Sequence, residues 1–181
     1  MLLLSFFFKI KFLSETIDDF RDFFNPDKQK REFDIKHALN KSLSLFGNQL
    51  ETNKIKLNMD ISDEKIFGIE TELEQVILNI ITNSMEAFNE RKIENREISI
   101  TVLSKQSYTI LIIEYNAGGV KEKNLEKIFD PYYTTKATGT GIGLYMVKLV
   151  IKNSLGGDLK INNSSKGLMY IIALPSEKTK E

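Results

Sequence analysis

The sequence predicts an α+β domain, a two-layer α/β sandwich in which a mixed, mostly antiparallel sheet packs on three principal helices. Three observations lead to this prediction. Helical spacing of apolar residues recurs in separate stretches, strand-like alternation or short apolar runs lie between and after them, and no internal repeat is present. The 181 residues, 41% of them hydrophobic, suffice for one core with a short appendage. We therefore expect a single folded domain.

The N-terminal stretch has the apolar spacing of a helix. Its apolar residues recur in steps of three and four, as in a coiled-coil seam: Leu3, Phe6, Ile10, Leu13, Ile17, Phe20 and Phe24. Pro26 disfavours helical geometry in the residue before it, so the helix should end near Asn25. We predict a helix over residues 1–25 that needs a partner, followed by a polar linker over 26–31. Ordinary packing of this stripe into a core is the alternative.

Composition argues against several classes of function. Lys and Arg total 25 and Asp and Glu total 25, so no net charge favours a nucleic-acid partner or an anionic membrane. The apolar opening, Met1 to Phe8, meets Lys9 too soon to span a bilayer, and we expect no membrane segment. The lack of cysteine removes disulfides, thiolate zinc sites and thiol nucleophiles, and it fits a reducing, cytoplasmic compartment.

The remaining elements follow from periodicity and from helix and turn residues. The predicted strands are residues 33–35, 55–61, 65–68, 97–103 and 108–115, with two more that end at Leu174. One helix presents Leu39, Leu43, Phe46 and Leu50 on a single face. A long helix runs from Thr71 to Asn89, with Thr71 as N-cap and Glu74 completing a capping box, and a last helix runs from Gly141 to about Asn153. Residues 116–140 are expected to form a flexible lid, the folded domain to cover 32–175, and the tail 176–181 to be disordered.

The long helix carries a polar stripe beside its apolar face. Gln75, Asn79, Asn83 and Glu86 are spaced four, four and three residues apart, so they lie on one side of the helix. Asparagine competes for backbone hydrogen bonds and is unfavourable inside a helix. A solvated helix face is one explanation. The other is that an asparagine amide oxygen is a suitable ligand for Mg²⁺, which takes further ligands from phosphates and water.

Two glycine-rich segments could hold a nucleotide. Asn116-Ala117-Gly118-Gly119-Val120 follows a buried strand, where glycine allows the backbone to approach a flat ligand. Gly139-Thr140-Gly141-Ile142-Gly143-Leu144 opens a helix, where free backbone amides and the helix dipole attract phosphate. Alone, the first segment is more typical of a plain turn, and the second is equally compatible with a plain helix entry. Neither ends in the Gly-Lys-Ser/Thr of a P-loop nor fits a dinucleotide-binding βαβ unit, so another ATP fold is required.

A further motif lies between the two glycine segments. Ile128-Phe129-Asp130-Pro131-Tyr132-Tyr133-Thr134-Thr135-Lys136 combines aromatic residues, which could hold a loop in place, with Lys136, a cation for the terminal phosphates of a nucleotide. The order of the four features along the chain is far more specific than any one of them.

In that order the four features resemble the catalytic ATP-binding domain of sensor histidine kinases, within the superfamily shared with gyrase-type and chaperone ATPases. "LEQVILNIITNSMEA" is similar to the N box, "NAGGV" to the first glycine box, "IFDPYYTTK" to the F box and "GTGIGL" to the second glycine box. The resemblance covers residues 33–174 and implies ATP and Mg²⁺ as ligands, with Asn83 on the metal and Asn79 beside the phosphates. The remaining nucleotide-binding positions that it implies are Tyr115, Ala117, Gly119, Val120, Lys136, Gly139, Thr140, Gly141, Ile142, Gly143 and Leu144. Asn79 and Lys136 would carry catalysis.

Two departures from the family pattern matter, one at the adenine contact and one at the phosphoacceptor. Tyr115 stands where the family has the Asp that accepts a hydrogen bond from the adenine amino group, and Ala117 stands at a glycine position. Loss of a hydrogen bond to a charged group would weaken ATP binding about 10- to 100-fold. The single histidine, His37, is followed by Ala38 and lacks the context of the family's phosphoacceptor, so a structural role is expected for it.

The resemblance implies transfer of the ATP γ-phosphoryl group to a histidine on a partner dimerisation domain, and then signalling to a response regulator. Residues 1–24 would match the second helix of the dimerisation hairpin and favour a homodimer. Asn79 stands where hydrolytic relatives have a Glu, so transfer is favoured over hydrolysis. Two alternatives remain: a catalytically silent interaction module with impaired ATP binding, and a serine kinase of the anti-sigma type, which the heptad helix disfavours.

Overall fold

The computed structural model describes residues 29–136 and 139–176. The predicted helix over 1–25, residues 26–28 of the predicted linker and the last five residues of the tail lie outside the described residues. Within them, no helix combines the length and the apolar character that crossing a bilayer requires.

The core of the fold is a five-stranded sheet with the order β2-β4-β5-β7-β6. Its strands are β2 (Ile55–Ile61), β4 (Arg96–Lys105), β5 (Tyr108–Tyr115), β6 (Asp158–Asn163) and β7 (Leu168–Pro175). The pair β2–β4 is parallel and the other three pairs are antiparallel, so the sheet is mixed and mostly antiparallel, as predicted. A separate two-stranded antiparallel sheet joins β1 (Arg31–Asp34) to β3 (Lys65–Gly68).

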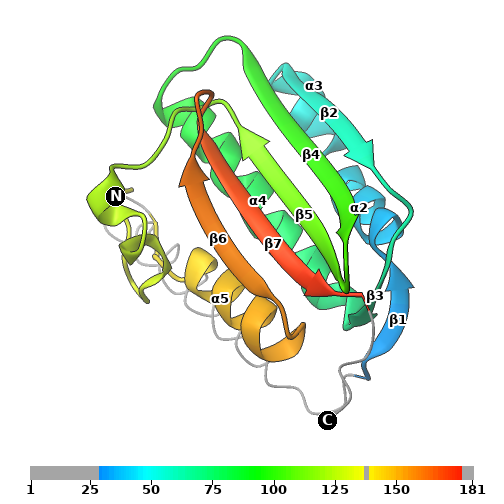
Figure 1. The fold of residues 1–181 in the computed structure, drawn as a ribbon. Coiled ribbons are helices and arrows are strands. Elements are labelled where there is room, and N and C mark those ends of the chain that lie inside the picture. The colour runs from blue at the N-terminus through cyan, green and yellow to red at the C-terminus, as the bar shows by residue number, and fades with distance from the viewer. Residues whose placement is uncertain (1–28, 137–138, 177–181) are drawn as a thin grey trace, which may run out of the picture.

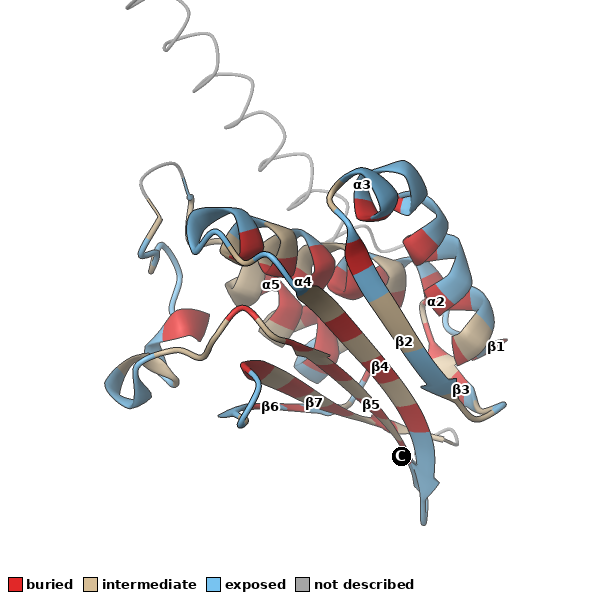
Figure 2. Ribbon diagram, turned by 90° about the horizontal axis from the view of Figure 1, so that it is seen from above, coloured by how far each residue is buried: buried red, intermediate tan, exposed pale blue. Residues whose placement is uncertain are grey.

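Helices cover one face of the large sheet (Figure 1). They are α2 (Ile35–Ser44), the short α3 (Gly47–Thr52), α4 (Glu70–Glu90) and α5 (Gly143–Leu149), which continues into a π-helical turn, η3 (Val150–Ser154). Buried and less buried residues alternate along β5 and β7 (Figure 2). The result is the predicted α+β two-layer arrangement, with its core between the sheet and α4.

The first helix begins at a clear sequence signal. Asp34 caps α2, and its carboxylate accepts hydrogen bonds from the backbone N–H groups of Lys36 at 2.7 Å and His37 at 3.3 Å. The four apolar residues predicted for one helix face are all buried, but they do not share one helix, because the chain turns between Ser44 and Gly47: Leu39 and Leu43 lie on α2, Phe46 in the turn and Leu50 on α3. Strand β1 also begins earlier than predicted, at Arg31.

Helix α4 is the longest element, and its N-cap differs from the prediction. The helix starts at Glu70 after Ile69, which makes no side-chain cap, so the predicted capping box at Thr71 is wrong. Two glutamates, Glu70 and Glu72, occupy the first turn instead, where the helix dipole favours negative charge. Tertiary contacts to Glu70 set this end of the helix.

The later elements match the prediction within a few residues. Strand β5 spans the predicted residues, and β4 is longer than predicted at both ends. Residues 116–136 contain two short 3₁₀ turns, η1 (Glu122–Asn124) and η2 (Lys127–Phe129). Ser176, expected to begin the disordered tail, donates its backbone N–H to the Ser107 carbonyl oxygen at 2.9 Å. The structure therefore extends one residue beyond the predicted end of the domain.

Candidate functional site

One open cavity of about 300 Å³ lies between α4 and the segment that leads into α5. From α4 it is lined by Asn79, Asn83, Glu86 and Glu90, among others, and from the opposite side by Tyr133, Lys136, Gly139, Gly141 and Gly143. The polar stripe of the long helix and the second glycine segment therefore lie on the same side of the sheet and share this cavity.

The two α4 asparagines that line the cavity, Asn79 and Asn83, use their amide nitrogens for hydrogen bonds within the helix. Asn79 donates its Nδ2 to the Gln75 carbonyl oxygen at 3.1 Å, and Asn83 donates its Nδ2 to the Asn79 carbonyl oxygen at 2.9 Å. Each amide nitrogen thus bonds to the backbone one turn earlier in the helix. This leaves the side-chain oxygens, the atoms that can bind a cation, for partners in the cavity.

The start of α5 lies directly against this helix face. A Cβ added at Gly143 would lie 3.0 Å from Asn79 Oδ1, so a side chain there would crowd the asparagine. Gly141 has φ +68°, and a Cβ there would come within 2.6 Å of the Tyr133 backbone nitrogen and oxygen. Glycine is required at position 141 for both reasons. The Gly141 carbonyl oxygen accepts a 3.1 Å hydrogen bond from the Tyr132 N–H, which joins the two segments.

The other end of the cavity is aromatic. Tyr115, at the end of β5, is 6% exposed and packs edge-on against Phe88, with ring centroids 6.0 Å apart. Its ring lies 6.3 Å from that of Tyr170 on β7. Burial raises the pKa of Tyr115, although a hydrogen bond with Tyr170 and the charge of Arg91 oppose this, and burial raises the pKa of Tyr170 well above its usual value. Both phenols are therefore neutral at physiological pH.

The first glycine segment packs against the protein more than it faces the cavity. Arg91 donates its Nη1 to the Ala117 carbonyl oxygen at 2.6 Å, and a Cβ at Gly118, where φ is +80°, would lie 2.7 Å from that nitrogen. A Cβ at Gly119 would lie 2.7 Å from Asn163 Cγ. Of the residues predicted from this segment, only Val120 lines the cavity along with Tyr115; Ala117 and Gly119 do not. Ile142 of the second segment is also outside the lining.

Several lining residues were not predicted as part of a site. Glu90 is the last residue of α4 and Arg91 is its C-cap, and Glu90 continues the polar stripe four residues beyond Glu86. That spacing was available in the sequence. Tyr170 could not be predicted from such spacing, because it reaches the cavity only through pairing of β7 with β5, where it lies opposite Ile113.

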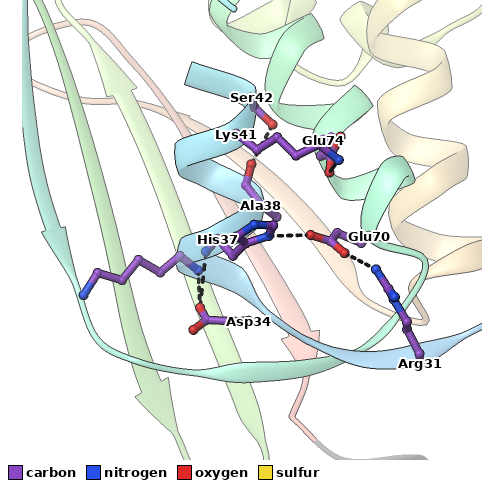
Figure 3. A network of polar contacts seen from close by, with 9 residues as sticks. Arg31, Asp34, His37, Ala38, Lys41, Ser42, Glu70 and Glu74 are labelled. Carbon is purple, nitrogen blue, oxygen red and sulfur yellow. Dashed lines mark hydrogen bonds and ion pairs between the residues drawn. The ribbon is translucent and has the colours of Figure 1, made fainter. Parts of the chain in front are cut away.

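His37 lies outside the cavity lining, in the first turn of α2. Its Nδ1 is 2.8 Å from Glu70 Oε1, and Arg31 donates its Nη2 to Glu70 Oε2 at 2.5 Å (Figure 3). These bonds, the His37 bond first, hold the pKa of Glu70 below its ordinary value against the opposing effect of burial. The contacts join β1, α2 and the start of α4, which agrees with the structural role expected for His37.

The cavity contains a pair of oxygens suited to a cation. Lys136 donates its Nζ to Asn83 Oδ1 at 2.8 Å and also forms an ion pair with the Glu86 carboxylate. One ammonium group thus contacts both oxygens, which shows that they converge on a single positive charge. The described residues offer no group of three or more acidic or histidine side chains around a metal position. A Mg²⁺ ion held here would therefore need ligands from phosphate and water as well.

An open glycine turn that faces polar oxygens across a cavity in a two-layer α+β fold defines a nucleotide-binding domain of the ATPase class. The chain belongs to the family described as histidine kinase-, DNA gyrase B-, and HSP90-like ATPase, whose model matches residues 68–178.

Similar proteins point to one branch of that family. Sensor histidine kinase ZraS of Salmonella typhi is 34% identical over 140 residues, which cover 74% of this chain and 29% of ZraS. Sporulation kinase C of Bacillus subtilis is 31% identical over 147 residues, which cover 77% of this chain and 33% of that kinase. The chain thus spans about a third of the length of these relatives.

Solved structures agree with the fold. The nucleotide-free catalytic domain of histidine kinase ThkA matches with a TM-score of 0.75 and 26% identity, covering 82% of this chain and 96% of that domain. ThkA in complex with the response regulator protein TrrA matches with a TM-score of 0.76 at 22% identity, covering 96% of this chain and 50% of that one. The chain has the fold of the ATP-binding catalytic domain of sensor histidine kinases.

Proposed function

We propose that the chain transfers the γ-phosphoryl group of ATP to a histidine on a partner dimerisation domain, as part of a two-component sensor histidine kinase. The observation that supports this most directly is the shared cavity. It brings the oxygens of two asparagines on α4 within reach of the open glycine turn at the start of α5. A polyanion with a bound cation fits between these two surfaces.

The chain's own residues would divide the work of binding and positioning. Asn83, with phosphate oxygens, would hold Mg²⁺, which supplies charge neutralisation and orients the phosphates. The backbone N–H groups near Gly141 and Gly143 would hold the phosphate chain, and Asn79 would lie beside it. Lys136 is positioned at the same end of the cavity and would offer its ammonium group to the terminal phosphate.

The arrangement favours transfer over hydrolysis. A hydrolytic site needs a carboxylate free to take a proton from water. Asn79, one turn before Asn83, carries an amide instead. Of the cavity carboxylates, that of Glu86 forms an ion pair with Lys136, and that of Glu90 lies two turns beyond Asn83 in the helix, away from the position that the hydrolytic carboxylate would take. An imidazole from another chain is itself a nucleophile, so its attack requires positioning more than proton removal.

We place the histidine that accepts the phosphoryl group on a partner, because His37 forms its contacts outside the cavity. Its imidazole contacts Glu70 and lies outside the cavity lining. A dimerisation domain with its own histidine, reached through residues 1–24 in a homodimer, is the expected partner. A response regulator would then receive the phosphoryl group; the complex of ThkA with TrrA is a precedent for that contact in a protein of the same fold. A cytoplasmic location follows from this proposal.

The direct test mixes the chain with a dimerisation domain that carries the histidine, and with Mg-ATP. We expect acid-labile, base-stable phosphate on the dimerisation domain, and its loss in Asn83→Ala. Asn89→Ala, which removes an asparagine near the end of α4 outside the cavity lining, serves as the matched control. Steady phosphate release by the isolated chain, at a rate that exceeds transfer, would contradict the proposal.

A second function is favoured by one observation: the end of the cavity where the adenine base would lie is aromatic. Tyr115 lines the cavity where the family has an acidic residue, and it is buried between Phe88 and Tyr170. A chain that cannot hold adenine there would act as an interaction module of the same fold. Isothermal titration with a non-hydrolysable ATP analogue separates the two functions, since a silent module gives no binding heat.

A further inference from the structure

The contact between Lys136 and α4 links two distant parts of the chain at the metal position. The Lys136 ammonium bonds to Asn83 Oδ1 at 2.8 Å and pairs with the Glu86 carboxylate. Lys136 is separated from both partners by about fifty positions in the sequence and lies between η2 and the glycine turn. The Lys136 side chain is 29% exposed and that of Glu86 is 52% exposed.

This ion pair adds little to the stability of the fold. A pair with one partner half-exposed contributes little to the free energy of unfolding, because solvent screens the charges and ordering the side chains costs entropy. Its position is more informative than its strength. It places a positive charge on the amide oxygen that, under the proposed function, binds Mg²⁺.

The ammonium and the metal ion cannot both use that oxygen without strong repulsion. Mg²⁺ requires an oxygen at about 2.0–2.1 Å, so a metal on Asn83 Oδ1 and an ammonium at its present place would be at most about 5 Å apart. Asn83 Nδ2 bonds to the Asn79 carbonyl oxygen, which fixes the direction of the amide. The lysine must therefore leave Asn83 when the metal arrives.

We propose that Glu86 is a positioning residue that holds the Lys136 ammonium on Asn83 until Mg-nucleotide displaces it. The proposal rests on the proposed function, because it takes Asn83 as the metal ligand. The ammonium stays beside the cavity while the site is free of nucleotide, and it is already close to the terminal phosphates when they enter. Glu86 thus sets the balance between two cations that compete for one oxygen.

The first test needs no nucleotide. Glu86→Gln removes the charge that holds the ammonium, so Lys136 should react faster with an acetylating reagent in the native chain, by about 2- to 5-fold if the pair has the strength of an exposed ion pair. Mass spectrometry measures the modification at each lysine. Lys41, which donates to Glu74 at 2.7 Å, is the internal reference and should react at the same rate in both proteins. An unchanged Lys136 rate would overturn the inference.

The second test distinguishes positioning from metal binding by its sign. If Glu86 holds the lysine in competition with the metal, Glu86→Gln should lower the Mg²⁺ concentration for half-maximal binding of a non-hydrolysable ATP analogue, by about 2- to 5-fold. If Glu86 is instead a ligand of the metal, that concentration should rise. A rise would overturn the inference.

Two further variants control for simple charge effects. Glu90→Gln removes the same charge from the next turn of α4 and from the same cavity, and no described residue forms an ion pair with Glu90. An equal shift in Glu86→Gln and Glu90→Gln would show a general field effect and contradict the specific role. In a Lys136→Met background, Glu86→Gln should leave the Mg²⁺ dependence unchanged; a shift that persists there would also contradict the specific role of Glu86.

If wild-type protein binds no nucleotide, the proposed function fails, while the acetylation result still decides whether Glu86 holds Lys136.

Discussion

Asn163 and Val120 form a pair of reciprocal hydrogen bonds that joins the first glycine segment to the end of β6. The Val120 N–H donates to Asn163 Oδ1 at 2.8 Å, and Asn163 Nδ2 donates to the Val120 carbonyl oxygen at 2.7 Å. The side-chain amide therefore replaces the backbone partner that a further strand would supply. Because Asn163 lies so close, Gly119 has no room for a Cβ on that side.

Asn163→Ala should loosen the wall of the cavity at Val120. Two hydrogen bonds are lost at an exposed position, so the free energy of unfolding should fall by about 1 kcal/mol, and nucleotide affinity should fall with it. Urea denaturation and isothermal titration measure the two effects. Asn162→Ala is the control, since within the described residues the Asn162 side chain forms no hydrogen bond. Equal effects of the two substitutions would show that the reciprocal pair has no special role.

Gly141→Ala should abolish nucleotide binding with little effect on the rest of the sheet. An alanine at φ +68° is strained, and its Cβ would clash with the Tyr133 backbone, so the turn must change shape. Gly47→Ala is the matched control, because a Cβ at Gly47 meets no atom within 4 Å; it should be neutral or stabilising by up to about 1 kcal/mol. Titration with an ATP analogue tests the first variant and thermal unfolding both. Wild-type affinity in Gly141→Ala would be incompatible with the proposed phosphate cradle.

Tyr115→Asp should strengthen ATP binding about 10- to 100-fold, because a carboxylate would accept a charge-assisted hydrogen bond from the adenine amino group. The smaller side chain also vacates space beside Phe88 and Tyr170. Tyr115→Phe keeps the ring and removes only the hydroxyl, so it should give no such gain. Isothermal titration of all three proteins measures the affinities. A gain in the phenylalanine variant that matched the aspartate variant would mean that the hydroxyl alone limits binding.

Glu70→Gln should destabilise the protein at neutral pH and lose this effect in acid. The Glu70 pKa is lowered in the folded state, so the unfolded chain takes up the proton first as pH falls. The stabilisation is therefore present above the ordinary glutamate pKa and disappears as pH falls through the lowered folded value. We expect a difference of about 1 kcal/mol at pH 7 that approaches zero near about pH 3.

Urea denaturation across that pH range provides the measurement for Glu70. Glu51→Gln, at an exposed position on α3, is the control and should show little difference at any pH. A Glu70→Gln difference that grew as the pH fell would contradict the sign derived from the lowered pKa.

Periodicity and the resemblance of the motifs predicted most of the fold. Apolar spacing located the long helix, and the buried run before Tyr115 located the central strand β5. Local patterns failed where tertiary contacts decide the ends of elements. Thr71 has the residue pattern of a capping box, yet Glu70 is held by Arg31 and His37, which lie more than thirty positions away, and the helix begins there instead.

The site was predicted less completely than the fold. The resemblance of the motifs around Asn79 and Asn83, and around Gly141 and Gly143, to the N box and the second glycine box implied that this helix and this turn meet at one cavity. The orientation of the first glycine segment was not predictable, because Arg91 and Asn163 take up the space beside it and neither forms a local pattern with it. Pairing of Lys136 with Glu86 likewise depends on how the chain returns to α4.

The parallel pairing of β2 with β4 has a kinetic consequence. Antiparallel β4 and β5 are neighbours in sequence and can pair through a tight turn, whereas β2 and β4 are joined by a crossover that includes β3 and α4. Closing such a loop costs chain entropy before contacts form, so we expect the edge strand β2 to join after the β4–β5 hairpin has formed. Helix α4, which bears both cavity asparagines, lies within that crossover, so the docking of β2 and the readiness of the cavity wall to receive a ligand would come in the same step.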